Sequence, residues 1–176
     1  MASYYYLISS LPMLKADGEL PITYPDFLKM CRSSVSDAKY TLLENLTLSS
    51  DKGPLVSDWA VFYKALMKEL TVYRNRRLDK QPQSGGTENE TLLKTVTDAV
   101  SGKNPLEAEK ALLALEMKKL DELIGLHYFD DHALIGYALK LKLLERKNIF
   151  DQKKGKAEMT RILDGLQKQI LIGNQE

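Results

Sequence analysis

Apolar residues recur at steps of three and four through most of this chain, which is typical of amphipathic helices. The clearest run follows Ser57 and Asp58, two residues that favour the opening of a helix. Its apolar stripe consists of Trp59, Phe62, Tyr63, Leu66, Leu70 and Tyr73. The opposite, solvated face is expected to carry Lys64, Lys68, Glu69, Arg74 and Arg76.

Capping signals predict where other helices begin and end. Thr23 precedes Pro25, and Asn104 precedes Pro105, so each pair combines a side-chain cap with a proline in the first helical turn. The helix that Asn104 opens is expected to run to about Gly125. A further helix is expected over residues 131–147. The last helix is expected to begin near Phe150 or to continue directly from the helix before it.

The opening segment, residues 4–12, is harder to assign. Its three tyrosines favour a strand, whereas Leu7, Leu11 and Leu14 have helical spacing and Pro12 interrupts both patterns. We expect a short buried segment there. The whole pattern predicts an all-α fold, an irregular bundle of about six or seven helices that includes long antiparallel helices.

One break stands out in the pattern. Residues 82–87 read Pro-Gln-Ser-Gly-Gly-Thr and contain no apolar side chain, which predicts a flexible linker. It separates an N-terminal helical part, residues 1–81, from a C-terminal helical part, residues 88–176, and we expect the two parts to pack as one body.

Composition narrows the range of functions that the chain could have. The chain has 176 residues, 44% of them hydrophobic, and a formal net charge of +1. A nucleic-acid binder needs a basic surplus, so nucleic acid is not an expected partner. A cytoplasmic location is expected, because the chain has a single cysteine and its N-terminus does not resemble a leader peptide. No apolar run is long enough to span a membrane, so any membrane contact is expected through partner proteins.

Few residue groups suggest chemistry. His127 and His132 lie five apart with two aspartates between them, so a metal site is conceivable, but this spacing matches no compact helical motif and favours helix capping. Cys31 fits a small buried thiol, and Gly85-Gly86 lacks the context of a phosphate loop. We therefore expect no catalytic residue, no cofactor and no metal ligand.

Three charged groups suggest contacts. Glu116 falls among leucines, so burial would require a cationic partner, which Arg146 or a helix lysine could supply. Arg74, Arg76 and Arg77 form a candidate interface for an acidic partner, although a solvated helix end would carry the same cations. The lysines around Gly155 (Lys153, Lys154 and Lys156) fit a solvated face.

Two stretches resemble an uncharacterised bacterial family whose genes lie among those for V-type ATPase components: Tyr4 to Pro12, with Ile22 to Tyr24 and Phe27-Leu28 after it, and Tyr63 to Leu78. Leu115 to Met117 and Tyr137 to Leu163 are similar to helical hairpins of the C subunit of A/V-type ATPases, which eukaryotes call the d subunit. The chain is about half the length of that protein.

The resemblance implies a non-catalytic coupling or assembly subunit. The C subunit caps the membrane rotor ring and receives the central stalk, so the stalk and rotor-ring subunits are the expected partners and the chain would lie at the inner membrane through the complex. Two alternatives remain at this point: a free-standing helical adaptor that binds a partner protein, and a small metal-dependent helical enzyme that uses the His127 to His132 region.

Overall fold

The computed structural model describes residues 4–77, 90–101, 104–149 and 152–173. These residues form eight helices and no strand: α1 (Tyr5–Ser10), α2 (Tyr24–Arg32), α3 (Asp37–Glu44), α4 (Val56–Arg77), α5 (Glu90–Ser101), α6 (Pro105–Ile124), α7 (Asp131–Ile149) and α8 (Gln152–Gly173). The prediction of an all-α bundle is confirmed, with slightly more helices than expected. The predicted linker, residues 82–87, lies outside the described residues.

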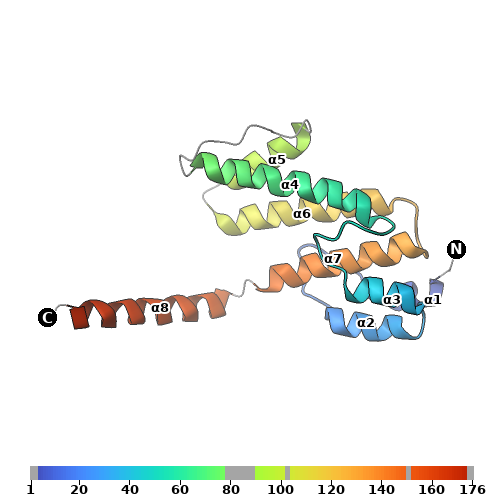
Figure 1. The fold of residues 1–176 in the computed structure, drawn as a ribbon, viewed down its shortest axis with the longest axis horizontal. Coiled ribbons are helices and arrows are strands. Elements are labelled where there is room, and N and C mark those ends of the chain that lie inside the picture. Colours follow the sequence, from blue (N-terminus) through green and yellow to red (C-terminus); the bar gives the residue numbers. More distant parts are fainter. Residues whose placement is uncertain (1–3, 78–89, 102–103, 150–151, 174–176) are drawn as a thin grey trace.

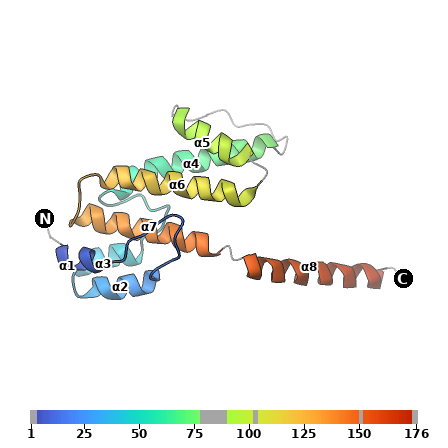
Figure 2. The same cartoon turned by 180° about the vertical axis from the view of Figure 1, so that it is seen from behind.

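The bundle is built around an antiparallel hairpin of α6 and α7 (Figure 1). Helices α4 and α5 pack on α6, while α2 packs on α7 together with its neighbour α3. The same layers are seen from behind in Figure 2. Because α7 lies between the two groups, it is covered along most of its length.

Two apolar cores hold these layers together. In the main core, Phe27 and Trp59 from the N-terminal half are completely buried against Leu120 and Leu139 from the C-terminal half. A second, smaller core forms where α5 covers the far ends of α4 and α6. It consists of Leu66, Leu70, Leu92, Val96, Ala99 and Leu112. Helices from both predicted parts therefore contribute to shared cores.

The predicted helix starts are confirmed by hydrogen bonds. The Asp26 N–H donates to the Thr23 hydroxyl at 3.4 Å, and the Leu106 N–H donates to Asn104 Oδ1 at 3.1 Å. Helix α6 ends at Gly125, where φ is +53°, a conformation that costs glycine little and other residues more. Local sequence thus sets both ends of α6, one of the two helices of the central hairpin.

The structure settles one open assignment and corrects another. The opening segment, whose type the sequence left open, is a helix, α1, with Tyr4 and Leu7 buried against the core and Tyr5 and Tyr6 exposed. Glu69, expected on the solvated face of α4, is buried. Helices α5 and α6 both pack on α4, so more than one side of α4 is in contact with the body.

Helix α8 extends away from the other seven helices that the structure describes, as Figures 1 and 2 both show. Residues 155–165 are exposed along this helix. Phe150, the expected start of the last helix, lies outside the described residues, and α8 is described from Gln152. Among the described helices, none combines the length and apolar character needed to cross a membrane.

Candidate functional site

Over residues 155–165, the part of α8 whose side chains the structure describes, the apolar side of the helix is open to solvent. Met159 is 57% exposed, Ile162 48% and Leu163 47%, and these three residues follow the three- and four-residue spacing of one helix face. The Glu158 carboxylate accepts a hydrogen bond from Arg161 Nε at 2.9 Å on the polar side. This face has the pattern of a buried helix but is not covered by the body, which makes it a candidate docking surface.

A second group of exposed apolar side chains lies at the opposite end of the body, where α1 meets the turn between α6 and α7 (Figure 1). We call it the aromatic end; it consists of Tyr5, Tyr6, Leu126, Tyr128 and Phe129. The rings of Tyr5 and Phe129 are 4.7 Å apart between centroids, and Tyr6 is 88% exposed. The turn is joined to α1 because the Tyr4 N–H donates to the Phe129 carbonyl at 2.7 Å.

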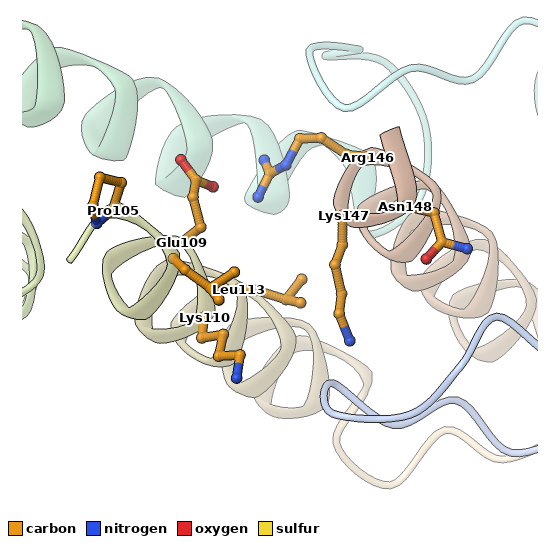
Figure 3. A pocket seen from close by; sticks show the side chains of 8 residues that line it. Pro105, Glu109, Lys110, Leu113, Arg146, Lys147 and Asn148 are labelled. Atoms are coloured by element: carbon orange, nitrogen blue, oxygen red, sulfur yellow. The ribbon is translucent and has the colours of Figure 1, made fainter. Parts of the chain in front are cut away.

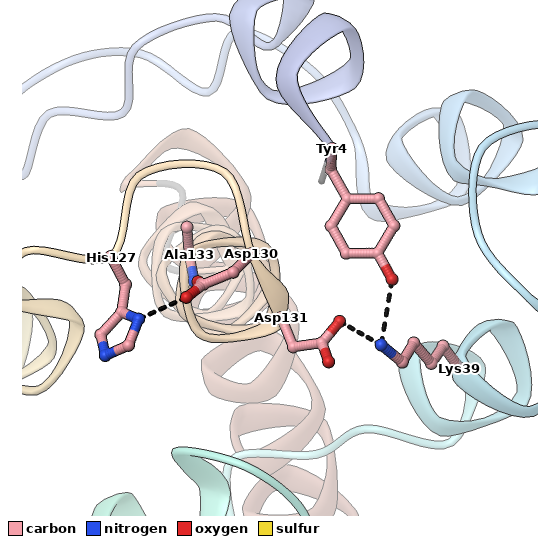
Figure 4. Close-up of polar contacts among 6 residues, drawn as sticks. All are labelled: Tyr4, Lys39, His127, Asp130, Asp131 and Ala133. Atoms are coloured by element: carbon pink, nitrogen blue, oxygen red, sulfur yellow. Dashed lines mark hydrogen bonds and ion pairs between the residues drawn. The ribbon is translucent and has the colours of Figure 1, made fainter. Parts of the chain in front are cut away.

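The same turn holds a cluster of potential metal ligands. His127 Nδ1 contacts Asp130 Oδ2, and the Nδ1 atoms of His127 and His132 are 3.4 Å apart (Figure 4 shows the first pair). The other Asp130 oxygen, Oδ1, accepts the Ala133 N–H at 3.1 Å and so caps α7. Burial would raise the pKa of Asp130, but hydrogen bonds from His127 and Ala133 outweigh it and lower that pKa.

An adjacent carboxylate has a different role. Asp131 pairs with Lys39 of α3, whose ammonium also donates to the Tyr4 hydroxyl at 3.1 Å (Figure 4). This network joins α1, α3 and the start of α7. The two neighbouring aspartates therefore point in different directions: Asp130 faces the histidines, and Asp131 faces the body.

Glu116 pairs with Arg146, one of the cations that were expected to serve as its partner. Glu116 on α6 is only 1% exposed, and Arg146 on α7 donates to both of its carboxylate oxygens, one of them at 2.9 Å. Burial raises the pKa of Glu116, while the hydrogen bonds from Arg146 act in the opposite direction. This two-bond geometry is typical of a structural ion pair that fixes two helices relative to each other.

An apolar groove lies between the start of α6 and the end of α7 (Figure 3). Its volume is about 740 Å³, and its walls include Pro105, Leu106 and Leu113 from α6. Lys147 lines its other side, and its ammonium donates to the Ala16 and Gly18 carbonyls at 2.8 and 3.2 Å. Leu106 is exposed in this groove, so the groove offers apolar surface to a partner.

The candidate arginine interface is only partly described. Arg74 is exposed near the end of α4 and lines a cavity of about 190 Å³ together with Glu109 and Arg146. The backbone of Arg76 and Arg77 completes α4, but their side chains lie outside the described residues. The interface with an acidic partner stays a prediction.

The other residues singled out in the sequence, the cysteine and the lysines around Gly155, lie in the core and on α8. Cys31 is completely buried in the main core, where burial raises the pKa of its thiol to about 12. Lys156 is exposed on α8, whereas the side chains of Lys153 and Lys154 are outside the described residues. Sequence reasoning missed the aromatic end, although its tyrosines and Phe129 were visible as apolar residues at a helix start and in a turn.

Comparison with known proteins relates the second half of the chain to a family. Residues 87–170 match a family model described as "Protein of unknown function (DUF2764)". The match spans just under half of the chain and includes α5, α6, α7 and most of α8. Searches of curated proteins and of solved structures found no match.

Proposed function

We propose that this chain is a non-catalytic coupling or assembly subunit of a V-type ATPase that binds stalk and rotor-ring subunits. The observation that carries the docking role is α8, a 22-residue helix that leaves the body with Met159, Ile162 and Leu163 exposed. The ATPase assignment rests on the resemblance of residues 4–12 and 63–78 to a family encoded among V-type ATPase genes. The family matched by residues 87–170 has no described function and adds nothing to that assignment.

The positions of the exposed apolar surfaces support a part that joins two partners. The aromatic end and α8 lie at opposite ends of the molecule (Figure 1). Between them, the α6–α7 hairpin is held by buried leucines and by the Glu116–Arg146 pair. A stiff hairpin between two separate apolar surfaces can transmit a displacement from one partner to the other, as a coupling protein must.

A free-standing helical adaptor is the second candidate. The groove beside Leu106 and Leu113 favours it, because an amphipathic helix of an unrelated protein docks by placing its apolar face in such a groove. The two proposals differ in the identity of the partner: ATPase subunits in the first, and a protein outside that complex in the second.

Affinity purification of the tagged full-length chain from its native cell, in mild detergent, tests the proposal. We expect stalk or rotor-ring subunits to be recovered with it. Recovery of no ATPase subunit would overturn the ATPase assignment, and reproducible recovery of an unrelated protein would favour the adaptor.

A pair of variants tests the role of α8. Met159→Asp places a charge on the apolar face, whereas Ala157→Asp adds the same charge about 200° around the helix. Both positions are exposed, so neither variant should change the free energy of unfolding by more than about 0.5 kcal/mol. Only Met159→Asp should lose the partner, and equal capture by both variants would exclude this face of α8 from binding.

A further inference from the structure

We propose that the turn between α6 and α7 and the first turn of α7 form a zinc-binding site from His127, Asp130 and His132. One ligand atom from each of these residues lies within 4.8 Å of the other two, with His127 and Asp130 in the turn and His132 in α7. The inference does not depend on the ATPase assignment, because it concerns a site contained within this chain alone.

The separation of the histidines fits the coordination geometry of zinc. Zinc–nitrogen bonds are about 2.0–2.1 Å long, so two nitrogen ligands at the corners of a tetrahedron are about 3.3–3.4 Å apart. The two Nδ1 atoms are 3.4 Å apart, with their rings at 70° to each other. In the absence of an ion, one ring N–H can donate to the other ring nitrogen across this distance, and a bound cation would replace that hydrogen bond with two coordinate bonds.

The carboxylate completes the set. Asp130 Oδ2 faces His127, while Oδ1 remains bound to the Ala133 N–H, so one oxygen caps α7 as the other is directed at the cluster. Oδ2 is closer to His127 Nδ1 than two zinc ligands would be. Because the His127 side chain is 44% exposed, its ring has room to move outward and admit the ion.

Charge also decides which ion fits. The positive end of the α7 dipole would oppose a cation, and the Asp130 carboxylate offsets this with a full negative charge next to the histidines. Two imidazoles and one carboxylate suit zinc, whereas magnesium and calcium prefer oxygen ligands. Three protein ligands leave the fourth zinc position open to water at this exposed turn.

The site would stiffen the aromatic end. Leu126 and Tyr128 flank His127, and Phe129 directly precedes Asp130, so an ion bound to the three ligands would fix the backbone that carries these apolar side chains. The adjacent aspartate, which pairs with Lys39 on the other side of the turn, is not needed as a ligand.

Titration of the tag-free full-length chain with zinc chloride, followed by calorimetry, tests the proposal directly. We expect one ion per chain, and visible absorption bands of tetrahedral cobalt when Co²⁺ replaces Zn²⁺. Competing strong ligands are few, because the chain has two histidines and its single cysteine is buried. Absence of binding at millimolar zinc would overturn the proposal.

Matched variants locate the ion. His127→Gln and His132→Gln each remove one ligand, and Asp130→Asn removes the charged ligand but keeps a side chain that can cap α7. Each should weaken zinc binding at least tenfold, since even residues that only orient ligands contribute about 10–100-fold. Glu122→Gln, an exposed carboxylate at the end of α6, is the control and should bind as the parent does. Unchanged affinity in both histidine variants, with native circular dichroism, would place the ion elsewhere and refute the site.

Discussion

Replacing Arg146 with methionine should strongly destabilise the fold, because it leaves the Glu116 carboxylate buried without its cationic partner. Methionine preserves most of the apolar stem of the arginine, so the change removes the charge and the two hydrogen bonds. The charge centres of such a two-bond pair are about 4 Å apart, and their attraction is about 4 kcal/mol at an effective dielectric constant of about 20. Breaking a buried pair on one side costs about 3–5 kcal/mol, which agrees with this value.

Removing both charges should cost much less. In the double variant Glu116→Leu with Arg146→Met, the Glu116 carboxylate is removed together with its partner, and replacement of a buried pair by apolar residues is often neutral. Urea unfolding of the parent, both single variants and the double variant gives the coupling free energy between the two positions. If the single variant Arg146→Met is too unstable to measure, Arg146→Lys, which keeps one charge and loses the two-bond geometry, should fall between it and the parent.

The loss should depend on pH with a defined sign. Burial already raises the pKa of Glu116 above its ordinary value of 4.5, and removal of Arg146 removes the hydrogen bonds that oppose that rise. A carboxyl whose pKa is raised in the folded state favours folding below its unfolded pKa, and this contribution disappears as pH rises through the folded pKa. Arg146→Met should therefore be least destabilising near pH 4 and most destabilising at neutral pH, by about 3–5 kcal/mol. A loss below about 1 kcal/mol at pH 7, or a loss that does not change with pH, would refute the reasoning.

Three further predictions concern single positions. Gly136→Ala should destabilise the fold by about 1–3 kcal/mol in thermal unfolding, because a Cβ there would lie 2.5 Å from Ile124 Cδ1. Adding Ile124→Val to this variant should recover part of the loss. Equal stability of Gly136→Ala and the parent would contradict this close packing. Cys31 should react with a thiol reagent only after unfolding, since burial raises its pKa to about 12, and rapid modification of the native chain would show an open core. Asn104→Ala should cost about 1 kcal/mol in urea unfolding through loss of the α6 cap, whereas Asn104→Asp should cost little; equal losses in the two variants would argue against the cap.

Most of the helices could be predicted because their signals are local. Thr23 and Asn104 accept hydrogen bonds from N–H groups within the next three residues, so their role requires no other part of the chain. The stripe from Trp59 to Leu70 likewise follows from the helical period alone. The type of the first segment was not predictable in this way, because Tyr4 and Leu7 are buried by helices far along the sequence.

The contacts at the candidate sites depend on which residues the fold brings close together. Burial of Glu116 suggested a partner, and Arg146, 30 residues away, was one of several cations that could have served. The histidine spacing favoured helix capping by an aspartate, which Asp130 does perform, yet the turn also brings the two imidazoles to 3.4 Å. Sequence spacing does not determine such a distance, because the path of a turn is set by the helices that it joins.

The sequence by itself determined that the chain is helical, where its main helices begin and end, and that its charged and apolar residues are divided between faces. Those properties arise from interactions within one helical turn. Only the tertiary structure decided which faces are covered: Glu69 is buried on α4, while Met159, Ile162 and Leu163 of α8 stay exposed on a helix that extends from the body. A helix pattern shows that a face favours burial, but the neighbour that buries it is chosen by packing across the whole chain.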